Sequence, residues 1–229
     1  MKKTDGGKVR YAVVGLGWFA QEAVLPAFAN SADNSELAAL VSGSAEKGRE
    51  LGDRYGVPVH DYDGYDRLLA GVGIDAVYIV LPNALHRDYT VRAARAGVHV
   101  LCEKPMAHTV ADCTLMRQAC DEAGVKLMIA YRLHFEEGNL QAIETLRSGK
   151  IGEPRAFSSF LTQQVEQGNT RLDADLGGGP LLDVGIYCLN AARYLFRSEP
   201  TEVMAFAVHG KDARFRAVPE AVSCLLRFP

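Results

Sequence analysis

The first 130 residues repeat one pattern, in which a short apolar run is followed by a turn and then by a stretch with helical periodicity. This alternation is typical of a parallel β-sheet whose strands are joined by crossover helices. Because such crossovers are right-handed, the pattern predicts a doubly wound sheet. The predicted buried strands are Tyr11–Val14, Leu37–Val41, Val57–His60, Ala76–Leu81, Val98–Cys102 and Lys126–Ala130.

A change of pattern after Ala130 predicts two domains, one over residues 1–130 and a second over residues 131–229. In the second domain helices and strands no longer alternate regularly, which is typical of an α+β arrangement. Its predicted elements are helices around Glu137–Ser148 and Pro180–Phe196 and strands near Arg155–Val165, Glu202–Val208 and Ala221–Phe228. The predicted fold class is therefore α/β, with an N-terminal Rossmann doubly wound parallel sheet and a C-terminal α+β domain with a mostly antiparallel open sheet.

The last predicted strand ends at Pro229 with no later segment to cover its edge. Exposed apolar edges are normally covered or blunted, because an open edge pairs readily with other chains. We therefore expect either a partner strand or a chain that has been cut short, so that the second domain is incomplete.

The predicted helix before the sixth strand has recognisable ends. Thr109, with Asp112 three residues later, forms a capping-box-like start. Gly124 is the kind of residue that closes a helix at its C-terminal side. These signals predict a helix between Thr109 and Gly124.

Composition, net charge and cysteine spacing argue against several classes of protein. The chain has 229 residues, of which 48% are hydrophobic and 23% charged, as expected for a globular protein with a substantial core. The formal net charge of -3, without a basic half, argues against a nucleic-acid-binding or repressor-like module. No apolar run is long enough to span a membrane, and five cysteines without a C-x-x-C pair argue against a zinc knuckle or a disulfide framework. We expect a cytoplasmic protein that acts on a small molecule and binds neither metal, membrane nor nucleic acid.

A glycine-rich turn follows the first predicted strand and opens a helix. It reads Gly15-Leu16-Gly17-Trp18-Phe19-Ala20, a G-x-G-x-x-A pattern. In this context Gly15 permits the tight turn, Gly17 lets a pyrophosphate approach the backbone, and Ala20 is small enough for close helix packing. The helix N-terminus then faces the phosphates. We predict a dinucleotide site that includes Trp18 and Phe19; the alternative is a glycine turn that only joins a strand to a helix.

The end of the second strand bears on which nucleotide is bound. NAD sites usually place Asp or Glu there to hold the ribose hydroxyls, whereas this chain has Ser42-Gly43-Ser44 with Lys47 one turn later. Serine hydroxyls and a lysine charge fit a 2′-phosphate better than a bare ribose. NADP is therefore the predicted cofactor, and NAD the less favoured one; the alternative is a solvated Lys47 beside Glu46.

Glu103-Lys104-Pro105 follows the fifth strand, at the carboxyl edge where open α/β sheets bind ligands. Pro105 restrains Lys104 to an extended conformation and makes a cis Lys-Pro bond accessible. An isolated tripeptide of this kind is usually an exposed loop end, but its position at the sheet edge favours an active-site role.

The predicted helix after the glycine run Gly177-Gly178-Gly179 carries a polar and aromatic face. Asp183, Tyr187, Asn190 and Tyr194 lie at i, i+4, i+7 and i+11 and so share one side. Such a stripe is usually core packing. Asp183 shifts the balance toward catalysis, because it lies in the first turn, where the helix dipole favours a carboxylate, and because glycines precede it that let backbone or substrate come close.

Taken together, the G-x-G-x-x-A turn, Glu103-Lys104-Pro105 and the segment Gly177–Tyr187 resemble the glucose-fructose oxidoreductase and inositol dehydrogenase (Gfo/Idh/MocA) family of NAD(P)-dependent sugar oxidoreductases. Most members carry His at the position of Tyr187, and the tyrosine is that of the glucose-fructose oxidoreductase branch. The segments Leu81-Pro82-Asn83 with His86, and Tyr131-Arg132-x-His134, are also similar to that branch.

The resemblance implies hydride transfer between the nicotinamide and a CH–OH or C=O group of a sugar or polyol. It implies that Tyr187 is the acid and base, that Lys104 stabilises the developing oxyanion, and that Asp183 orients Lys104 and the sugar hydroxyls. Arg171 is a weaker candidate for substrate contact, because Thr170-Arg171 stands where the family has a tryptophan-arginine pair. The implied cofactor contacts beyond the first turn are Pro82, Asn83, His86, Glu103, Lys104 and Arg132.

The chain differs from this family at both of its ends. Glucose-fructose oxidoreductase has a long N-terminal arm that helps retain its nucleotide, whereas few residues precede the first strand here, so we expect NADP to dissociate between turnovers. Family members also continue well beyond this length and complete a sheet that commonly forms the dimer interface, which implies a homo-oligomer through the C-terminal sheet. The alternative function is a catalytically idle NADP-binding sensor or subunit.

Overall fold

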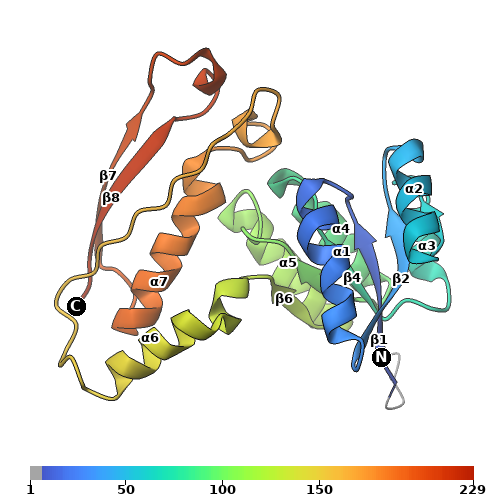
Figure 1. The fold of residues 1–229 in the computed structure, drawn as a ribbon, viewed down its shortest axis with the longest axis horizontal. Coiled ribbons are helices and arrows are strands. Elements are labelled where there is room, and N and C mark those ends of the chain that lie inside the picture. Colours follow the sequence, from blue (N-terminus) through green and yellow to red (C-terminus); the bar gives the residue numbers. More distant parts are fainter. Residues whose placement is uncertain (1–6) are drawn as a thin grey trace. The chain divides into compact units, whose positions relative to one another are not determined.

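The computed structural model describes residues 7–229 (Figure 1). The chain divides into two compact units, Met1–Ala130 and Tyr131–Pro229. The boundary along the chain falls between residues 130 and 131, where the sequence pattern changes.

Six parallel strands form the sheet of the first unit, in the order β3-β2-β1-β4-β5-β6. This is the strand order of a dinucleotide-binding Rossmann sheet, so the predicted fold class is confirmed. The sequence order reverses between β1 and β4, which creates the switch point where such sheets bind ligands. The strands are β1 (Val9–Val14), β2 (Ser35–Val41), β3 (Val59–His60), β4 (Ala76–Ile79), β5 (His99–Cys102) and β6 (Leu127–Ile129).

Helices and helical turns connect these strands. α5 begins and ends as predicted, because the Thr109 hydroxyl accepts a hydrogen bond from the Asp112 N–H at 3.1 Å and Gly124 closes the helix in a left-handed conformation. The longer helices are α2 (Ala45–Tyr55), α3 (Tyr65–Ala70), α4 (His86–Arg95) and α5 (Val110–Ala123). Shorter ones are the π-helical turn η1 (Ala20–Val24), α1 (Leu25–Ala27), and the 3₁₀ turns η2 (Phe28–Ser31) and η3 (Asn83–Leu85).

Both faces of the sheet are buried. Ala12 and Val14 on β1 point into one apolar cluster, which includes Tyr65 of α3, whereas Val13 between them points into the other, with Leu51 of α2. Burial of a Val or Leu side chain contributes about 1.5–3 kcal/mol. Because residues on both faces must be apolar, the strands read as continuous hydrophobic runs, which made them predictable from sequence.

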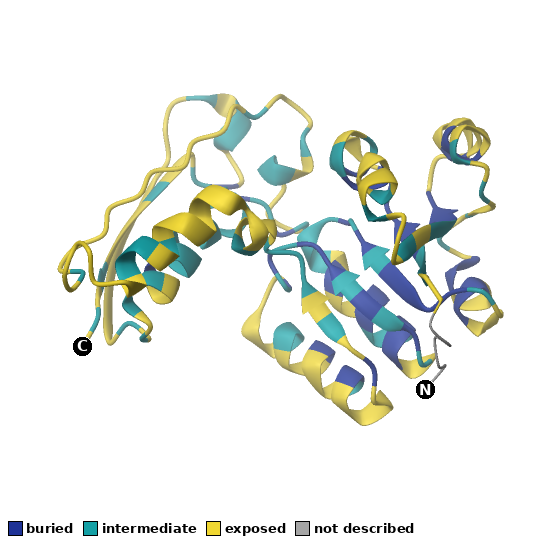
Figure 2. Ribbon diagram, turned by 60° about the horizontal axis from the view of Figure 1, so that its bottom comes forward, coloured by how far each residue is buried: buried dark blue, intermediate teal, exposed yellow. Residues whose placement is uncertain are grey.

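The second unit contains fewer buried residues (Figure 2). Its strands β7 and β8 form an antiparallel hairpin in which Glu202 pairs with Arg227 and Val208 with Ala221. Every residue of β7 is exposed. The elements are η4 (Arg132–Phe135), α6 (Glu137–Arg147), η5 (Thr170–Leu172), the π-helical turn η6 (Leu181–Gly185), α7 (Ile186–Phe196), β7 (Glu202–Val208), η7 (Ala213–Phe215) and β8 (Ala221–Arg227).

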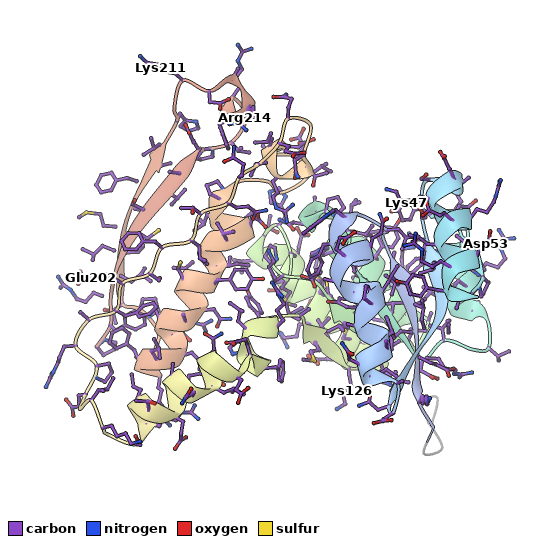
Figure 3. All side chains as sticks on the ribbon, viewed as in Figure 1. Lys47, Asp53, Lys126, Glu202, Lys211 and Arg214 are labelled. Carbon is purple, nitrogen blue, oxygen red and sulfur yellow. The ribbon has the colours of Figure 1, made fainter. Side chains whose placement is uncertain are left out.

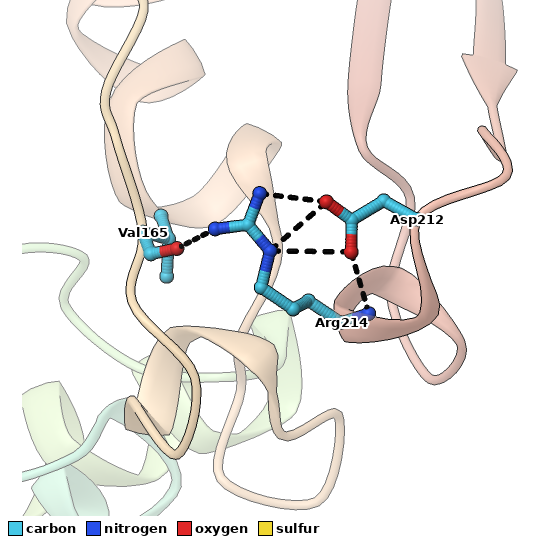
Figure 4. A network of polar contacts seen from close by, with 3 residues as sticks. All are labelled: Val165, Asp212 and Arg214. Carbon is cyan, nitrogen blue, oxygen red and sulfur yellow. Dashed lines mark hydrogen bonds and ion pairs between the residues drawn. The ribbon is translucent and has the colours of Figure 1, made fainter.

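The strand predicted near Arg155–Val165 is wrong. Residues 155–165 are extended but pair with no strand of the described chain, and Phe160 is 90% exposed. One polar contact ties the end of this segment to the hairpin: the Arg214 guanidinium donates to the Val165 carbonyl at 2.5 Å and pairs with Asp212 (Figure 4). This pairing with Arg214 lowers the pKa of Asp212.

Candidate functional site

The glycine-rich turn after β1 contains two glycines with different physical requirements. Gly15 has a φ of +96°, and a Cβ there would lie 2.4 Å from the Val80 carbonyl oxygen, so the approach of the β4 end demands glycine. At Gly17 a Cβ would meet no atom of the described residues within 4 Å. The fold alone therefore does not require glycine at position 17, as expected if a ligand approaches the backbone there.

Of the other residues of this turn, some are packed in the core and one is exposed. Ala20 is fully buried in the same apolar cluster as Val13, which Phe19 also contacts, whereas Trp18 is 75% exposed. The Gln21 side-chain amide donates to the Leu16 carbonyl at 3.0 Å and ties the turn to η1. The small residue predicted at Ala20 thus serves helix packing, and Trp18 is placed where solvent or a ligand can reach it.

The two serines of the loop after β2 form hydrogen bonds within the loop and with the start of α2. The Ser42 hydroxyl donates to the Ser44 carbonyl at 3.2 Å and accepts from the Ser44 N–H at 3.1 Å. Ser44 caps α2 by accepting from the Lys47 N–H at 3.3 Å. The Ser44 hydroxyl still has a proton to donate, and the exposed Lys47 lies in the first turn of α2 (Figure 3). Sequence reasoning assigned both serines to the ligand and missed these internal roles.

A solvent-open hollow of about 900 Å³ lies beside this loop, between the ends of β2 and β3. Its lining includes Ser42, Gly43 and Ser44 on one side and His60 and Asp61 on the other. A Cβ at Gly43 would lie 2.9 Å from the Tyr62 ring, so a larger residue would displace that ring. The hollow continues along α2, past Arg49 and Asp53, and leaves the loop open to solvent on this side.

His86 links the loops that follow β4 and β5. Its ring is fully buried, with Nδ1 2.8 Å from the Pro105 carbonyl oxygen and Nε2 2.8 Å from that of Leu81. Burial lowers the pKa of this imidazole, and a neutral ring donates to only one carbonyl at a time. Both ring nitrogens face backbone carbonyls, so the ring links the loops after β4 and β5, and the predicted cofactor contact of His86 stays a prediction.

Glu103 and Lys104 lie in the loop after β5. Glu103 is buried, and its carboxylate accepts from the Tyr78 hydroxyl at 2.6 Å and from the Lys104 N–H at 3.2 Å. The Lys104-Pro105 bond is cis. Lys104 itself is half-buried. Tyr78, on the neighbouring strand β4, is a supporting residue that sequence analysis missed, because no spacing rule links it to Glu103.

Pro82 and Asn83 occupy the corresponding position after β4, where Pro82 precedes the 3₁₀ turn η3. The turns after β1, β2, β4 and β5 thus all lie at the carboxyl edge of one parallel sheet. This edge, next to the switch point, is where doubly wound sheets bind dinucleotides.

In the second unit, Asp183 and Tyr187 lie on successive turns of η6 and α7. Asp183 accepts a hydrogen bond from Arg171 Nε at 2.5 Å, and its side chain is 14% exposed. Tyr187 is half-buried, with its ring 6.3 Å from that of Tyr131 in an edge-to-face arrangement. A π-helical turn at the position of a candidate catalytic residue is a recurring feature of functional sites.

The predicted shared face of this helix is present. Beyond Tyr187, Asn190 lies 3.1 Å from His134 Nε2, and the rings of Tyr194 and His134 are 4.7 Å apart. The side chains of Tyr131 and His134 therefore contact this face, which the sequence did not reveal. Arg132, between them, is exposed in η4, and its predicted contact with the cofactor stays a prediction.

Backbone packing within the unit accounts for the glycine run. Gly177 and Gly179 have φ values of +79° and +109°. A Cβ at Gly178 would lie 2.5 Å from the Arg171 carbonyl oxygen and 2.6 Å from that of Asp173. The glycines were predicted to let backbone or substrate come close. In the structure, the backbone of η5 makes this close approach.

Residues 7–229 contain neither a cluster of metal-binding side chains nor a membrane-spanning helix. No group of His, Cys, Asp and Glu residues is arranged to hold a metal ion. None of the helices there is both long and apolar enough to cross a membrane.

These observations define a domain with the strand order of dinucleotide-binding Rossmann folds, followed by a second unit that carries a polar helix face. Comparison with family models agrees: residues 9–131 match the oxidoreductase family with an NAD-binding Rossmann fold, and residues 139–229 match the GFO/IDH/MocA C-terminal domain. The chain belongs to the GFO/IDH/MocA oxidoreductase family, as the sequence motifs predicted.

Individual relatives include sugar oxidoreductases. The chain is 36% identical to a D-xylose 1-dehydrogenase [NADP(+)] of Haloarcula marismortui, over 93% of this chain and 61% of that protein. It resembles the crystal structure of an aldose-aldose oxidoreductase from Caulobacter crescentus, with 44% identity and a TM-score of 0.89, over 97% of this chain and 68% of that one. A 3-ketoreductase from Actinomadura kijaniata, solved with NADP and TDP-benzene, has 34% identity and a TM-score of 0.85, over 96% of this chain and 66% of that one.

The chain spans about three fifths to two thirds of the length of the curated relatives it matches.

Proposed function

We propose that this protein is an NADP-dependent oxidoreductase that transfers hydride between the nicotinamide and a CH–OH or C=O group of a sugar or polyol. The observation that carries the proposal is the carboxyl edge of the first unit's sheet. There the open Gly17 turn follows β1, the turn with Ser44 and Lys47 follows β2, and the Lys104 loop follows β5. The relatives support the same class, since they include an NADP-dependent xylose dehydrogenase and an NADP-bound ketoreductase.

The residues at this edge fit NADP. Gly17 leaves space for a pyrophosphate beside the start of η1. No carboxylate stands at the end of β2, where NAD enzymes hold the ribose, and Lys47 brings a positive charge to the first turn of α2. Trp18, Pro82 and Asn83 complete the proposed cofactor contacts.

The proposed chemistry divides the work among three side chains. When bound, the nicotinamide accepts or gives the hydride. The Tyr187 hydroxyl takes the substrate's hydroxyl proton during oxidation and returns it during reduction. The Lys104 ammonium stabilises the negative charge that develops on the same oxygen, and Asp183 orients the substrate hydroxyls.

A homo-oligomer through the C-terminal sheet is part of this proposal. On one face of the hairpin, Met204, Phe206 and Leu225 are each 59–71% exposed. Contiguous exposed apolar side chains of this kind mark interaction surfaces. We also propose that the protein acts in the cytoplasm.

Cofactor titration and a substrate screen test the proposal together. We expect tighter binding of NADP than of NAD, and a Lys47→Ala variant should lose about tenfold in NADP affinity with little change for NAD, because a charge-assisted contact is worth about 1.5–3 kcal/mol. Aldoses, ketoses and polyols are then screened by NADPH absorbance. A clear NAD preference would contradict the cofactor assignment, and NADP binding without turnover would instead support an idle sensor or subunit.

A further inference from the structure

Arg171 makes a direct ion pair with a proposed site residue of the same unit. Its Nε donates to Asp183 Oδ2 at 2.5 Å, and the two side chains are 36% and 14% exposed. The pair joins η5 to η6 across a separation of twelve residues in the chain. A short charge-assisted contact in a partly buried setting fixes both partners more firmly than an exposed surface pair does.

The backbone around Arg171 is held in place independently of this ion pair. The Asn169 side chain accepts from the Arg171 N–H at 3.0 Å and caps η5. The Gly179 N–H donates to the Arg171 carbonyl at 2.9 Å, and the Gly178 N–H donates to the Asp173 carbonyl at 2.8 Å. These hydrogen bonds join η5 to the glycine run that leads into η6. The backbone of Arg171 is therefore held at a fixed position relative to Asp183.

Gly178 allows η5 and the glycine run to approach each other this closely. A Cβ at this position would lie 2.5 Å from the Arg171 carbonyl oxygen, far inside normal contact distance. Any larger residue would push η5 away from the glycine run and lengthen the Arg171–Asp183 contact. The glycine run, the cap and the ion pair therefore form one arrangement that ends at the Asp183 carboxylate.

We propose that Arg171 is a positioning residue that holds the Asp183 carboxylate in a single orientation, rather than a residue whose main contact is with the substrate. This inference rests on the proposed function in so far as Asp183 belongs to the reactive site. Loss of Arg171 would remove this charge-assisted contact from the Asp183 carboxylate and so loosen the orientation of its Oδ2 atom. Misplacement of a positioning group by about 1 Å can cost about a hundredfold in rate.

A double-mutant cycle of Arg171→Met and Asp183→Asn tests this role through kinetics. Arg171→Met should lower kcat about 10- to 100-fold, with a change in KM of less than about threefold and unchanged NADP affinity. In the Asp183→Asn background, the same change should lower kcat by less than about twofold, because the group it positions is already altered. Arg171→Lys should recover part of the lost kcat.

Two kinetic results would overturn the inference. One is a multiplicative effect of the two substitutions, which would mean that they act independently. The other is a raised KM with unchanged kcat in Arg171→Met, which would mean that Arg171 binds substrate directly. Arg193→Met is the matched control: Arg193 pairs with Glu199 at the exposed end of α7, and its loss should leave kcat unchanged.

The same cycle measured by urea unfolding does not depend on turnover. The unfolding equilibrium constants should show a coupling between Arg171 and Asp183 of about fivefold or more, larger than that for Arg193 and Glu199. If the unmodified chain turns over no sugar, the proposed function fails, and the stability cycle then decides only whether Arg171 holds the Asp183 carboxylate. Additive stability effects would contradict it.

Discussion

The two units of this chain are stabilised by different kinds of interaction. In the first, Val13, Val14, Leu40 and Val41 are completely inaccessible, and apolar clusters cover both faces of the sheet. In the second, all residues of β7 are exposed, and specific polar contacts such as Arg171–Asp183 and Arg214–Val165 connect the segments. Burial provides a rigid platform for the proposed cofactor, whereas ion pairs and caps shape the proposed catalytic face.

The largest effect on stability is expected at Gly15. Gly15→Ala places a Cβ 2.4 Å from the Val80 carbonyl oxygen in a left-handed backbone, and should destabilise the first unit by about 4 kcal/mol. Gly17→Ala, where the Cβ meets no described atom within 4 Å, should change stability by less than about 0.5 kcal/mol but weaken NADP binding. Urea unfolding and cofactor titration of both variants make the comparison. Equal stability losses would show that Gly17 is also a packing residue.

A core truncation compares the two units directly. Leu40→Ala removes a side chain with 0% exposure and should cost about 3 kcal/mol. Met204→Ala on β7, where Met204 is 59% exposed, should cost less than about 0.5 kcal/mol in the monomer. Thermal unfolding at low protein concentration measures both. A large loss for Met204→Ala would mean that the hairpin packs against something that protects it in the monomer.

His86 adds a pH dependence to the first unit. Because burial lowers its pKa in the folded state, the unfolded chain takes up the proton first as the pH falls below about 6.5. Stability contributed by the neutral ring is therefore complete above that pH and declines, by up to about 1.4 kcal/mol per pH unit, until the pH reaches the lower folded pKa. His86→Gln keeps an amide donor without titrating, so this slope should disappear. An unchanged slope in urea unfolding would assign it to other groups.

Much of the first unit could be predicted from the sequence because burial on both sides leaves continuous apolar runs. The strand predicted at Arg155–Val165 failed for the opposite reason: a suitable pattern forms a strand only where a neighbouring edge is available. The contacts of His86 and Arg171 were missed because their partners, Pro105 and Asp183, lie nineteen and twelve residues away in the chain. Motif spacing identifies residues that face a ligand more readily than those that hold such residues in place.

The central claim is that Tyr187 carries the proton in an NADP-dependent sugar oxidation or reduction, and Tyr187→Phe tests it most directly. Tyr194→Phe, on the same helix face and 41% exposed, is the matched control. Loss of a general acid or base costs about 10²- to 10⁴-fold, so turnover of the best substrate should fall by that amount in Tyr187→Phe, with NADP affinity unchanged, and stay near normal in Tyr194→Phe. Near-normal turnover in Tyr187→Phe would contradict the account and place proton transfer on another residue.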